Sequence, residues 1–309
     1  MTNVSVFLVE SADIDPDAVA LRCGDVSTAY VQLANDVARF AEYLIDGGIQ
    51  PGDRIGVMLP NGPGFVVVFY GALHAGAVVV PMCPSQHARA LEYLLTITDS
   101  RALFFSSRRS VATTVAAVTA GAQPIGVGKH SIVRLIAGFA GHAHPVGRAV
   151  DDTAVILHTT AAAGASRSAE LTHGNLIADQ TALARGLLNL EPDDVVMSCL
   201  PLWEACGMTC ALMATMAAGA TLVLPPKFYP GEALELIAAQ RVTVFEGNPK
   251  MYAAMLEVAD RYELDFGSLR VCISAGAPLP VDVLHRFEDR FGCVVMDRWG
   301  AAETRRRCT

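Results

Sequence analysis

Residues 65–81 read FVVVFYGALHAGAVVVP, a stretch that has no acidic residue, lysine or arginine. Gly76 divides it into a helix expected over 65–74 and a β-branched strand expected over 77–81. Residues 207–224 have the same order, with a helix expected over 207–218 and a strand expected over 221–224. Neither stretch has basic flanks, so buried helix–strand units explain both stretches better than membrane spans do.

The same alternation extends along the chain in both directions. Further strands are expected at residues 54–59, 102–105, 154–158, 195–199, 242–246, 270–274 and 294–297. Further helices are expected at residues 29–47, 87–98, 173–187, 231–239, 249–260 and 281–291. Residues 121–150 have weak periodicity and are expected to form an irregular connection. Strands that are regularly separated by helices imply largely parallel sheets with helices on both faces.

Composition and charge limit the class of protein. The chain has 309 residues, of which 52% are hydrophobic, so it is long enough for two packed units. Its net charge of -8 argues against a nucleic-acid partner, because phosphate binding needs clustered lysine and arginine. No basic segment precedes an apolar run at the N-terminus, so no secretion signal is expected. No C-x-x-C pair occurs, and Cys206 and Cys210 are expected as buried thiols in a reducing, cytoplasmic protein.

Several short motifs follow one another along the chain. They are Pro51-Gly52-Asp53-Arg54 with Leu59-Pro60-Asn61, the stretch 71–81, Leu171-Thr172-His173-Gly174-Asn175, Leu200-Pro201-Leu202-Trp203 with Gly207, Ser274-Ala275-Gly276-Ala277-Pro278-Leu279, and Trp299-Gly300-Ala301-Ala302-Glu303-Thr304. No single motif is decisive. Their joint order from about residue 18 to residue 304 resembles the adenylate-forming superfamily, which contains the acyl-CoA ligases, the luciferases and the non-ribosomal adenylation domains.

The resemblance implies an α/β fold with two doubly wound, largely parallel sheet subdomains. We expect the first sheet unit over residues 65–190, and the second over residues 1–64 together with 191–309. Compared with the superfamily, the chain stops soon after Glu303, so it is expected to lack most of the small barrel and the C-terminal domain. The superfamily's catalytic lysine would then lie beyond Thr309, and the truncated chain alone is expected to be inactive or impaired.

The phosphate loop of the superfamily has the sequence Thr-Ser-Gly-Thr-Thr-Gly-x-Pro-Lys-Gly, whose glycines turn backbone N–H groups toward phosphate. Residues 159–168 of this chain read TTAAAGASRS. The expected phosphate contacts are Thr159, Thr160, Gly164 and Arg167, the last in place of the lysine. Ala162 and Ala163 stand for two threonines, and the loss of two hydrogen bonds to a charged group would weaken binding by about 3–6 kcal/mol. Arg167 keeps the positive charge without the compact geometry of lysine.

The remaining cofactor residues also follow from the resemblance. They are expected to be Ser274, Gly276, Ala277, Pro278, Trp299 and Gly300. Trp299 would stack on adenine in place of the usual tyrosine, or would pack as a core aromatic residue. Glu303 matches the magnesium-associated glutamate of the superfamily, and it is the expected metal ligand and, with Arg167, the expected catalytic residue. The implied cofactors are ATP, Mg²⁺ and coenzyme A.

The expected substrate pocket comprises Trp203, Glu204, Gly207 and Met208. Related ligases usually carry a histidine at Glu204, and a carboxylate there would repel the carboxylate of a substrate unless it is protonated. Met208, Met213 and Met216 have helical spacing, which suits a flexible aliphatic pocket but also an ordinary core. A fatty acid is the preferred small-molecule substrate.

The resemblance implies that ATP converts a carboxylate to an acyl-adenylate, which a thiol then converts to a thioester. Two alternatives remain open: a non-catalytic module that binds an acyl group or an adenylate, and a degenerate remnant. A nicotinamide dehydrogenase is disfavoured because no G-x-G-x-x-G follows a strand, and residues 164–168 lack the second glycine of a hydrolase nucleophile elbow. We expect a homo-dimer or a partner chain to cover the apolar surface that a missing domain would leave.

Overall fold

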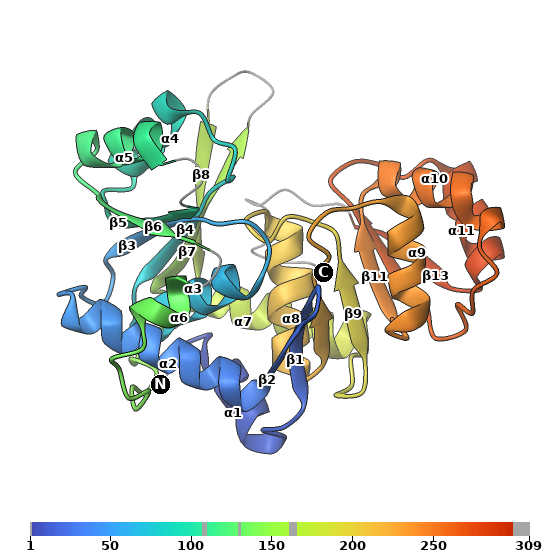
Figure 1. The fold of residues 1–309 in the computed structure, drawn as a ribbon, viewed down its shortest axis with the longest axis horizontal. Helices are drawn as coiled ribbons and strands as arrows, with labels where there is room; N and C mark the ends of the chain where they lie inside the picture. Colours follow the sequence, from blue (N-terminus) through green and yellow to red (C-terminus); the bar gives the residue numbers. More distant parts are fainter. Residues whose placement is uncertain (1, 107–109, 129–130, 161–165, 299–309) are drawn as a thin grey trace.

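The computed structural model describes residues 2–106, 110–128, 131–160 and 166–298. Two β-sheets lie in separate lobes (Figure 1). The six-stranded sheet has the order β6 (Gln123–Val127), β5 (Ser100–Ser106), β3 (Arg54–Met58), β4 (Val78–Pro81), β7 (Thr153–Thr160), β8 (Ser166–Thr172). The seven-stranded sheet has the order β13 (Val294–Arg298), β12 (Val271–Ala275), β11 (Val244–Gly247), β9 (Val195–Ser198), β10 (Thr221–Val223), β1 (Val19–Cys23), β2 (Val26–Ala29). Only the pairs β1–β2 and β7–β8 are antiparallel among the described strands, which confirms two largely parallel sheets.

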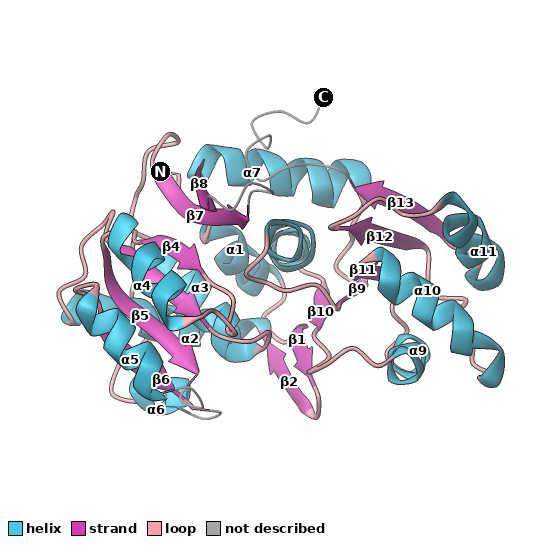
Figure 2. Ribbon diagram, turned by 90° about the horizontal axis from the view of Figure 1, so that it is seen from above, coloured by secondary structure: helices cyan, strands magenta, loops and turns pink. Residues whose placement is uncertain are grey.

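The helices form three groups around these sheets. They are α1 (Val6–Ile14), α2 (Tyr30–Asp46), α3 (Pro63–His74), α4 (Ala88–Ile97), α5 (Ser110–Thr119), α6 (Ser131–Leu135), α7 (His173–Thr181), α8 (Ala214–Ala218), α9 (Pro230–Ala239), α10 (Pro249–Val258) and α11 (Val281–Phe291), with π-helical turns η2 (Ala182–Leu187) and η3 (Gly207–Met213) and a 3₁₀ turn η4 (Ala259–Arg261). Helices α4 and α5 cover the outer face of the six-stranded sheet, and α9 to α11 cover the outer face of the seven-stranded sheet (Figures 1 and 2). Helices α2, α3, α7 and α8 contribute to the central core that joins the two sheets.

The central core explains the uncharged stretch with which the sequence analysis began. Helix α3 carries no charged side chain, and its residues from Phe65 to His74 are all buried. A Cβ on Gly71 would lie 2.6 Å from the Phe40 ring, so glycine allows α2 and α3 to approach closely. No helix among the described residues is long and apolar enough to cross a membrane. The prediction that α3 is a buried core helix is therefore confirmed.

The expected boundary between the two sheet units needs a correction. Residues 1–64 were assigned to the second sheet, but β3 pairs with β4 and β5 inside the first sheet. The reason is that β3, α3 and β4 form one β–α–β unit, whose short helical crossover keeps the two parallel strands together. The strands β1 and β2 do belong to the second sheet, as the division implied.

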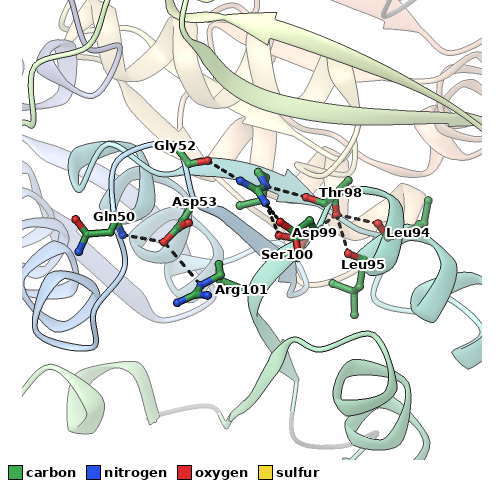
Figure 3. Close-up of polar contacts among 10 residues, drawn as sticks. Gln50, Gly52, Asp53, Leu94, Leu95, Thr98, Asp99, Ser100 and Arg101 are labelled. Carbon is green, nitrogen blue, oxygen red and sulfur yellow. Dashed lines mark hydrogen bonds and ion pairs between the residues drawn. The ribbon is translucent and has the colours of Figure 1, made fainter.

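The amino-terminal ends of β3 and β5 are joined by a network of polar contacts (Figure 3). Arg54 donates from Nε to the Thr98 carbonyl oxygen at 2.8 Å and forms an ion pair with Asp99. Arg101 lies 3.9 Å from the Asp53 carboxylate. Because these side chains contact one another, this edge of the sheet has a structural role. Parallel sheets bind ligands at the opposite edge, outside the carboxyl ends of their strands.

Candidate functional site

The strand order of the seven-stranded sheet places a candidate site at its carboxyl edge. From β9 the chain crosses to β10 on one side and then returns to β11 on the other side of β9. Parallel sheets bind ligands outside the carboxyl ends of their strands at such a reversal. The segments that follow β9, β11 and β12 therefore share one edge, and two of them carry residues predicted from the sequence.

The first segment is residues 200–204, which we name the acyl-side loop after the acyl contact that the resemblance implies. Leu202 is fully buried, Trp203 is half-buried against the central core, and Glu204 is exposed. A Cβ on Gly207 would lie 2.2 Å from the Pro201 carbonyl oxygen. Only glycine permits this close approach between the loop and the helical turn that follows it. The predicted pocket residue Gly207 thus has a clear structural role.

The other predicted pocket residues differ in their surroundings. Met208, Met213 and Met216 are fully buried in the central core, where protein atoms surround them. Desolvation by neighbouring protein raises the pKa of Glu204, although the residue as a whole is exposed. A raised pKa favours the protonated form, which a substrate carboxylate tolerates better than a charged one. Contact of Trp203, Glu204 or Met208 with an acyl group stays a prediction.

The second segment follows β12. Gly276 has φ +90°, and Gly276, Ala277 and Pro278 are exposed. Ser274 is fully buried, and its hydroxyl has no hydrogen-bond partner among the described residues. The Leu279 N–H donates to the Asp297 carboxylate at 3.2 Å and ties this turn to the end of β13. Contact of Ser274, Gly276, Ala277 or Pro278 with a cofactor stays a prediction.

Between these two segments lies a buried carboxyl group that the sequence reasoning missed. Glu246 on β11 is fully buried beside Ser198, whose Oγ donates to Oε2 at 3.4 Å. Its Oε1 has no hydrogen-bond partner in the described part of the chain. Burial raises the pKa of Glu246 well above its usual range, and the nearby Cys210 acts in the same direction while Arg298 opposes it. A glutamate at the carboxyl end of the apolar run 242–246 was the signal available in the sequence.

Two thiols lie near this carboxyl group. Cys206 is half-buried, Cys210 is fully buried, and their sulfur atoms lie 3.3 Å apart. Nowhere in the described ranges do three or more His, Cys, Asp or Glu side chains group to hold a metal ion. The predicted magnesium ligand Glu303 lies outside those ranges, so its role stays a prediction.

The predicted phosphate loop sits on the hairpin of β7 and β8. Pairing runs as far as Thr160 and Ser166, and residues 161–165, which include Gly164, lie outside the described residues. Thr159, Thr160 and Arg167 are on the paired strands, next to the described pair in which His158 Nδ1 lies 3.0 Å from Ser168 Oγ. Burial lowers the pKa of His158, which agrees with a packing role. Phosphate contacts by the predicted residues stay predictions.

An ion pair joins helix α7, which follows the hairpin, to the end of β13. Arg298 at the end of β13 lies 3.1 Å from Asp179 on α7, and both side chains are largely buried. Helix α7 follows the hairpin in the chain. Its end lies beside β13 (Figure 2). The predicted residues Trp299 and Gly300 lie outside the described residues.

Comparison with known proteins identifies the family. A sequence profile described as "AMP-binding enzyme" matches residues 8–306. The chain belongs to this family. Feruloyl-CoA synthase from Amycolatopsis sp. is 31% identical over 301 residues, which cover 96% of this chain and 58% of that protein. The long-chain-fatty-acid–CoA ligase of Bacillus subtilis is 26% identical over 330 residues, which cover 96% of this chain and 59% of that protein.

A solved structure agrees with the observed fold. ATP-bound MatB from Rhodopseudomonas palustris is similar to this chain with a TM-score of 0.90 and 26% identity, covering 98% of this chain and 61% of that one. The chain thus spans 58% to 61% of the length of the three proteins named. These comparisons confirm the predicted superfamily and the two-sheet α/β fold of an AMP-binding domain.

Proposed function

We propose that this chain is the acyl-adenylate-binding part of an AMP-forming acid–CoA ligase. In such a reaction the substrate carboxylate attacks the α-phosphate of ATP, pyrophosphate leaves, and the thiol of coenzyme A then displaces AMP. The observation that carries the proposal is the carboxyl edge of the seven-stranded sheet. There the acyl-side loop and the turn at Gly276 flank one topological switch point in a sequence that matches the AMP-binding family.

Each residue of the proposed site has a separate role. The exposed backbone from Gly276 to Pro278 lies against the adenine ring, and Trp299 stacks on the same ring. Trp203 and Glu204 border the acyl group. Arg167 supplies positive charge to the phosphates. Mg²⁺, when bound, offsets the phosphate charge, and Glu303 is the residue proposed to hold it.

The substrate in this proposal is a hydrophobic carboxylic acid, with a fatty acid preferred. The half-buried Trp203 gives the loop a large apolar side chain, which favours an apolar acyl group. Related proteins named as a feruloyl-CoA synthase and a long-chain-fatty-acid–CoA ligase support the two chemical alternatives, an aryl and an aliphatic acid. A matched pair of aryl and aliphatic adenylates distinguishes them by affinity.

The second candidate is a module that binds an acyl-adenylate without forming it. The observation that favours it is the sequence of the phosphate loop, where Ala162 and Ala163 replace two hydroxyl side chains. Such a loop is proposed to bind the β- and γ-phosphates of ATP weakly, whereas an acyl-adenylate has neither phosphate. A cytoplasmic location and a homo-dimer or partner chain remain parts of both proposals.

Isothermal titration calorimetry tests the proposed function directly. The chain is titrated with a non-hydrolysable long-chain acyl-adenylate and, in parallel, with ATP and Mg²⁺. Tight binding of the adenylate together with weaker binding of ATP is the expected result. Absence of heat from both ligands in a folded sample would contradict the proposed function and leave a degenerate remnant as the interpretation.

A further inference from the structure

The acyl-side loop is held by a residue of the other sheet. Asn61 lies between β3 and α3, just beyond the carboxyl end of a central strand of the six-stranded sheet. Its Nδ2 donates to the Leu200 carbonyl oxygen at 2.8 Å, and its Oδ1 accepts from the Leu202 N–H at 2.9 Å. One side-chain amide therefore bridges two backbone groups that flank Pro201 and fixes the loop between them.

Other contacts leave the loop few alternatives. The Leu200 N–H donates to Ser198 Oγ at 3.3 Å, and the Glu204 N–H donates to the Pro201 carbonyl oxygen at 3.1 Å. The Leu202 side chain is fully buried, which anchors the middle of the loop in the core. The two hydrogen bonds of Asn61 cross from one lobe to the other. The loop is thus preorganised by a residue outside its own sheet.

We propose that Asn61 is a positioning residue for the acyl substrate. This inference rests on the proposed function, since it assigns the acyl group to the loop at Trp203 and Glu204. Asn61 does not itself touch the ligand in this proposal. Its two hydrogen bonds set the backbone from which both side chains extend, so the geometry of the acyl end depends on the six-stranded sheet.

The two hydrogen bonds of Asn61 suggest a substitution that removes one of them and keeps the size of the side chain. Asn61→Asp keeps the size of the side chain and the oxygen that accepts from Leu202, but it places an oxygen opposite the Leu200 carbonyl oxygen. Two acceptors then face each other, and the loop loses its bridge. Asn175→Asp is the matched control. Asn175 is also half-buried, and the hydrogen bond that its Oδ1 accepts from the Thr172 N–H at 3.2 Å survives the change.

Binding of two ligands distinguishes a loss of loop positioning from a general loss of structure. In calorimetry, Asn61→Asp is expected to weaken binding of the acyl-adenylate analogue at least tenfold and to change AMP binding less than twofold. AMP has no acyl group, so a general loss of structure would weaken both ligands. The control Asn175→Asp is expected to match the original chain with both. Unchanged adenylate affinity in Asn61→Asp, or equal weakening of both ligands, would overturn the proposal.

A spectroscopic measurement needs no ligand. The chain has two tryptophans, so Trp299→Phe leaves Trp203 as the only tryptophan reporter. In that background, Asn61→Asp is expected to increase acrylamide quenching of Trp203 at least twofold, and Asn175→Asp is expected to leave it unchanged. Unchanged quenching would show that Asn61 does not hold the loop. Failure of the unsubstituted chain to bind the adenylate would instead reject the proposed function.

A second variant covers the case in which Asn61→Asp does not fold. Asn61→Ser is smaller and uncharged, and its side chain is too short to bridge both backbone groups. It is measured with the same two ligands and the same quenching assay. The expected selective loss of adenylate affinity supports the proposal, and its absence in a folded variant overturns it.

Discussion

His173 provides a quantitative test of how protonation affects this fold. The side chain is fully buried at the start of α7. Its Nδ1 accepts from the Val4 N–H at 3.1 Å, so in the neutral ring the proton is on Nε2. Burial lowers the pKa of His173 from 6.5 to about 4, and the Arg148 cation acts in the same direction while Asp152 opposes it.

The sign and the size of the effect follow from the two pKa values. The unfolded chain takes up a proton near pH 6.5, whereas the folded protein takes it up near pH 4. The contribution of His173 to stability is therefore complete above pH 6.5 and is lost as the pH falls toward 4. The whole interval corresponds to about 3 kcal/mol, of which about 2 kcal/mol is lost by pH 5.

Urea unfolding at pH 7.5 and pH 5.0 measures this loss. In His173→Asn the side-chain oxygen can accept from Val4 but does not titrate, so only the pH-dependent contribution is removed. Between the two pH values, the original chain is expected to lose about 2 kcal/mol more free energy of unfolding than this variant does. The exposed His285 serves as the control site, and His285→Asn is expected to behave like the original chain. Equal pH dependence in the original chain and His173→Asn would refute the reasoning.

Three further tests concern the ligand site and the fold. The double change Ala162→Thr and Ala163→Thr restores two phosphate-binding hydroxyls. It is expected to raise ATP affinity at least tenfold in calorimetry and to leave adenylate affinity unchanged. An unchanged ATP affinity would show that these two alanines do not weaken phosphate binding. Glu204→Gln is expected to raise the affinity for a free fatty acid more at pH 7.5 than at pH 5, because only the ionised glutamate repels the substrate. An equal gain in affinity at both pH values would show that charge repulsion by Glu204 is not its cause. Arg270→Met is expected to lower the free energy of unfolding by about 2–3 kcal/mol in urea denaturation. The reason is that Asp194, which lies 2.6 Å from Arg270, would become a buried carboxylate without its cation. A change below about 0.5 kcal/mol would show that solvent stabilises the Asp194 carboxylate in place of Arg270.

The strands that the sequence predicted are those with apolar, β-branched runs. For example, β3, β9 and β12 lie inside their sheets and are buried on both faces, so hydrophobic continuity alone identifies them. The long helix α2 was predicted from a different pattern. Its apolar residues recur at helical spacing and face the central core. Buried, locally uniform segments are the part of this fold that pattern reasoning recovers.

The missed strands include β1 and β2 in the seven-stranded sheet, and β6 and β8, which lie at the two edges of the six-stranded sheet. In β6 the sequence Gln-Pro-Ile-Gly-Val interrupts any apolar pattern, yet an edge strand tolerates proline because one side of its backbone needs no partner. In β8 the sequence Ser-Arg-Ser-Ala-Glu-Leu-Thr is largely polar, and the antiparallel partner β7 determines its conformation. Such pairings are set by tertiary contact, so a single-sequence pattern does not reveal them.

The site was predictable only where its residues occur in contiguous motifs. The acyl-side loop and the turn at Gly276 were located because each carries a short continuous motif that resembles the superfamily. The bridge from Asn61 to Leu200 spans 139 positions in the sequence, and no periodicity records such a contact. Glu246 looked like the end of a strand, and its burial became evident only when β9 and the turn η3 were placed around it.

The two edges of the seven-stranded sheet differ in how their polar groups are satisfied. At the amino edge, Asp194 accepts hydrogen bonds from Arg270 and Thr243, which outweigh the effect of burial and lower its pKa. At the carboxyl edge, the Ser274 hydroxyl and one oxygen of Glu246 are buried without a hydrogen-bond partner among the described residues. A buried polar atom without a partner destabilises a fold by about 1–3 kcal/mol. Asp194 is therefore fully satisfied at the amino edge, whereas the Ser274 hydroxyl and the Glu246 oxygen lie unsatisfied by the described part of the chain at the edge that we propose binds the ligand.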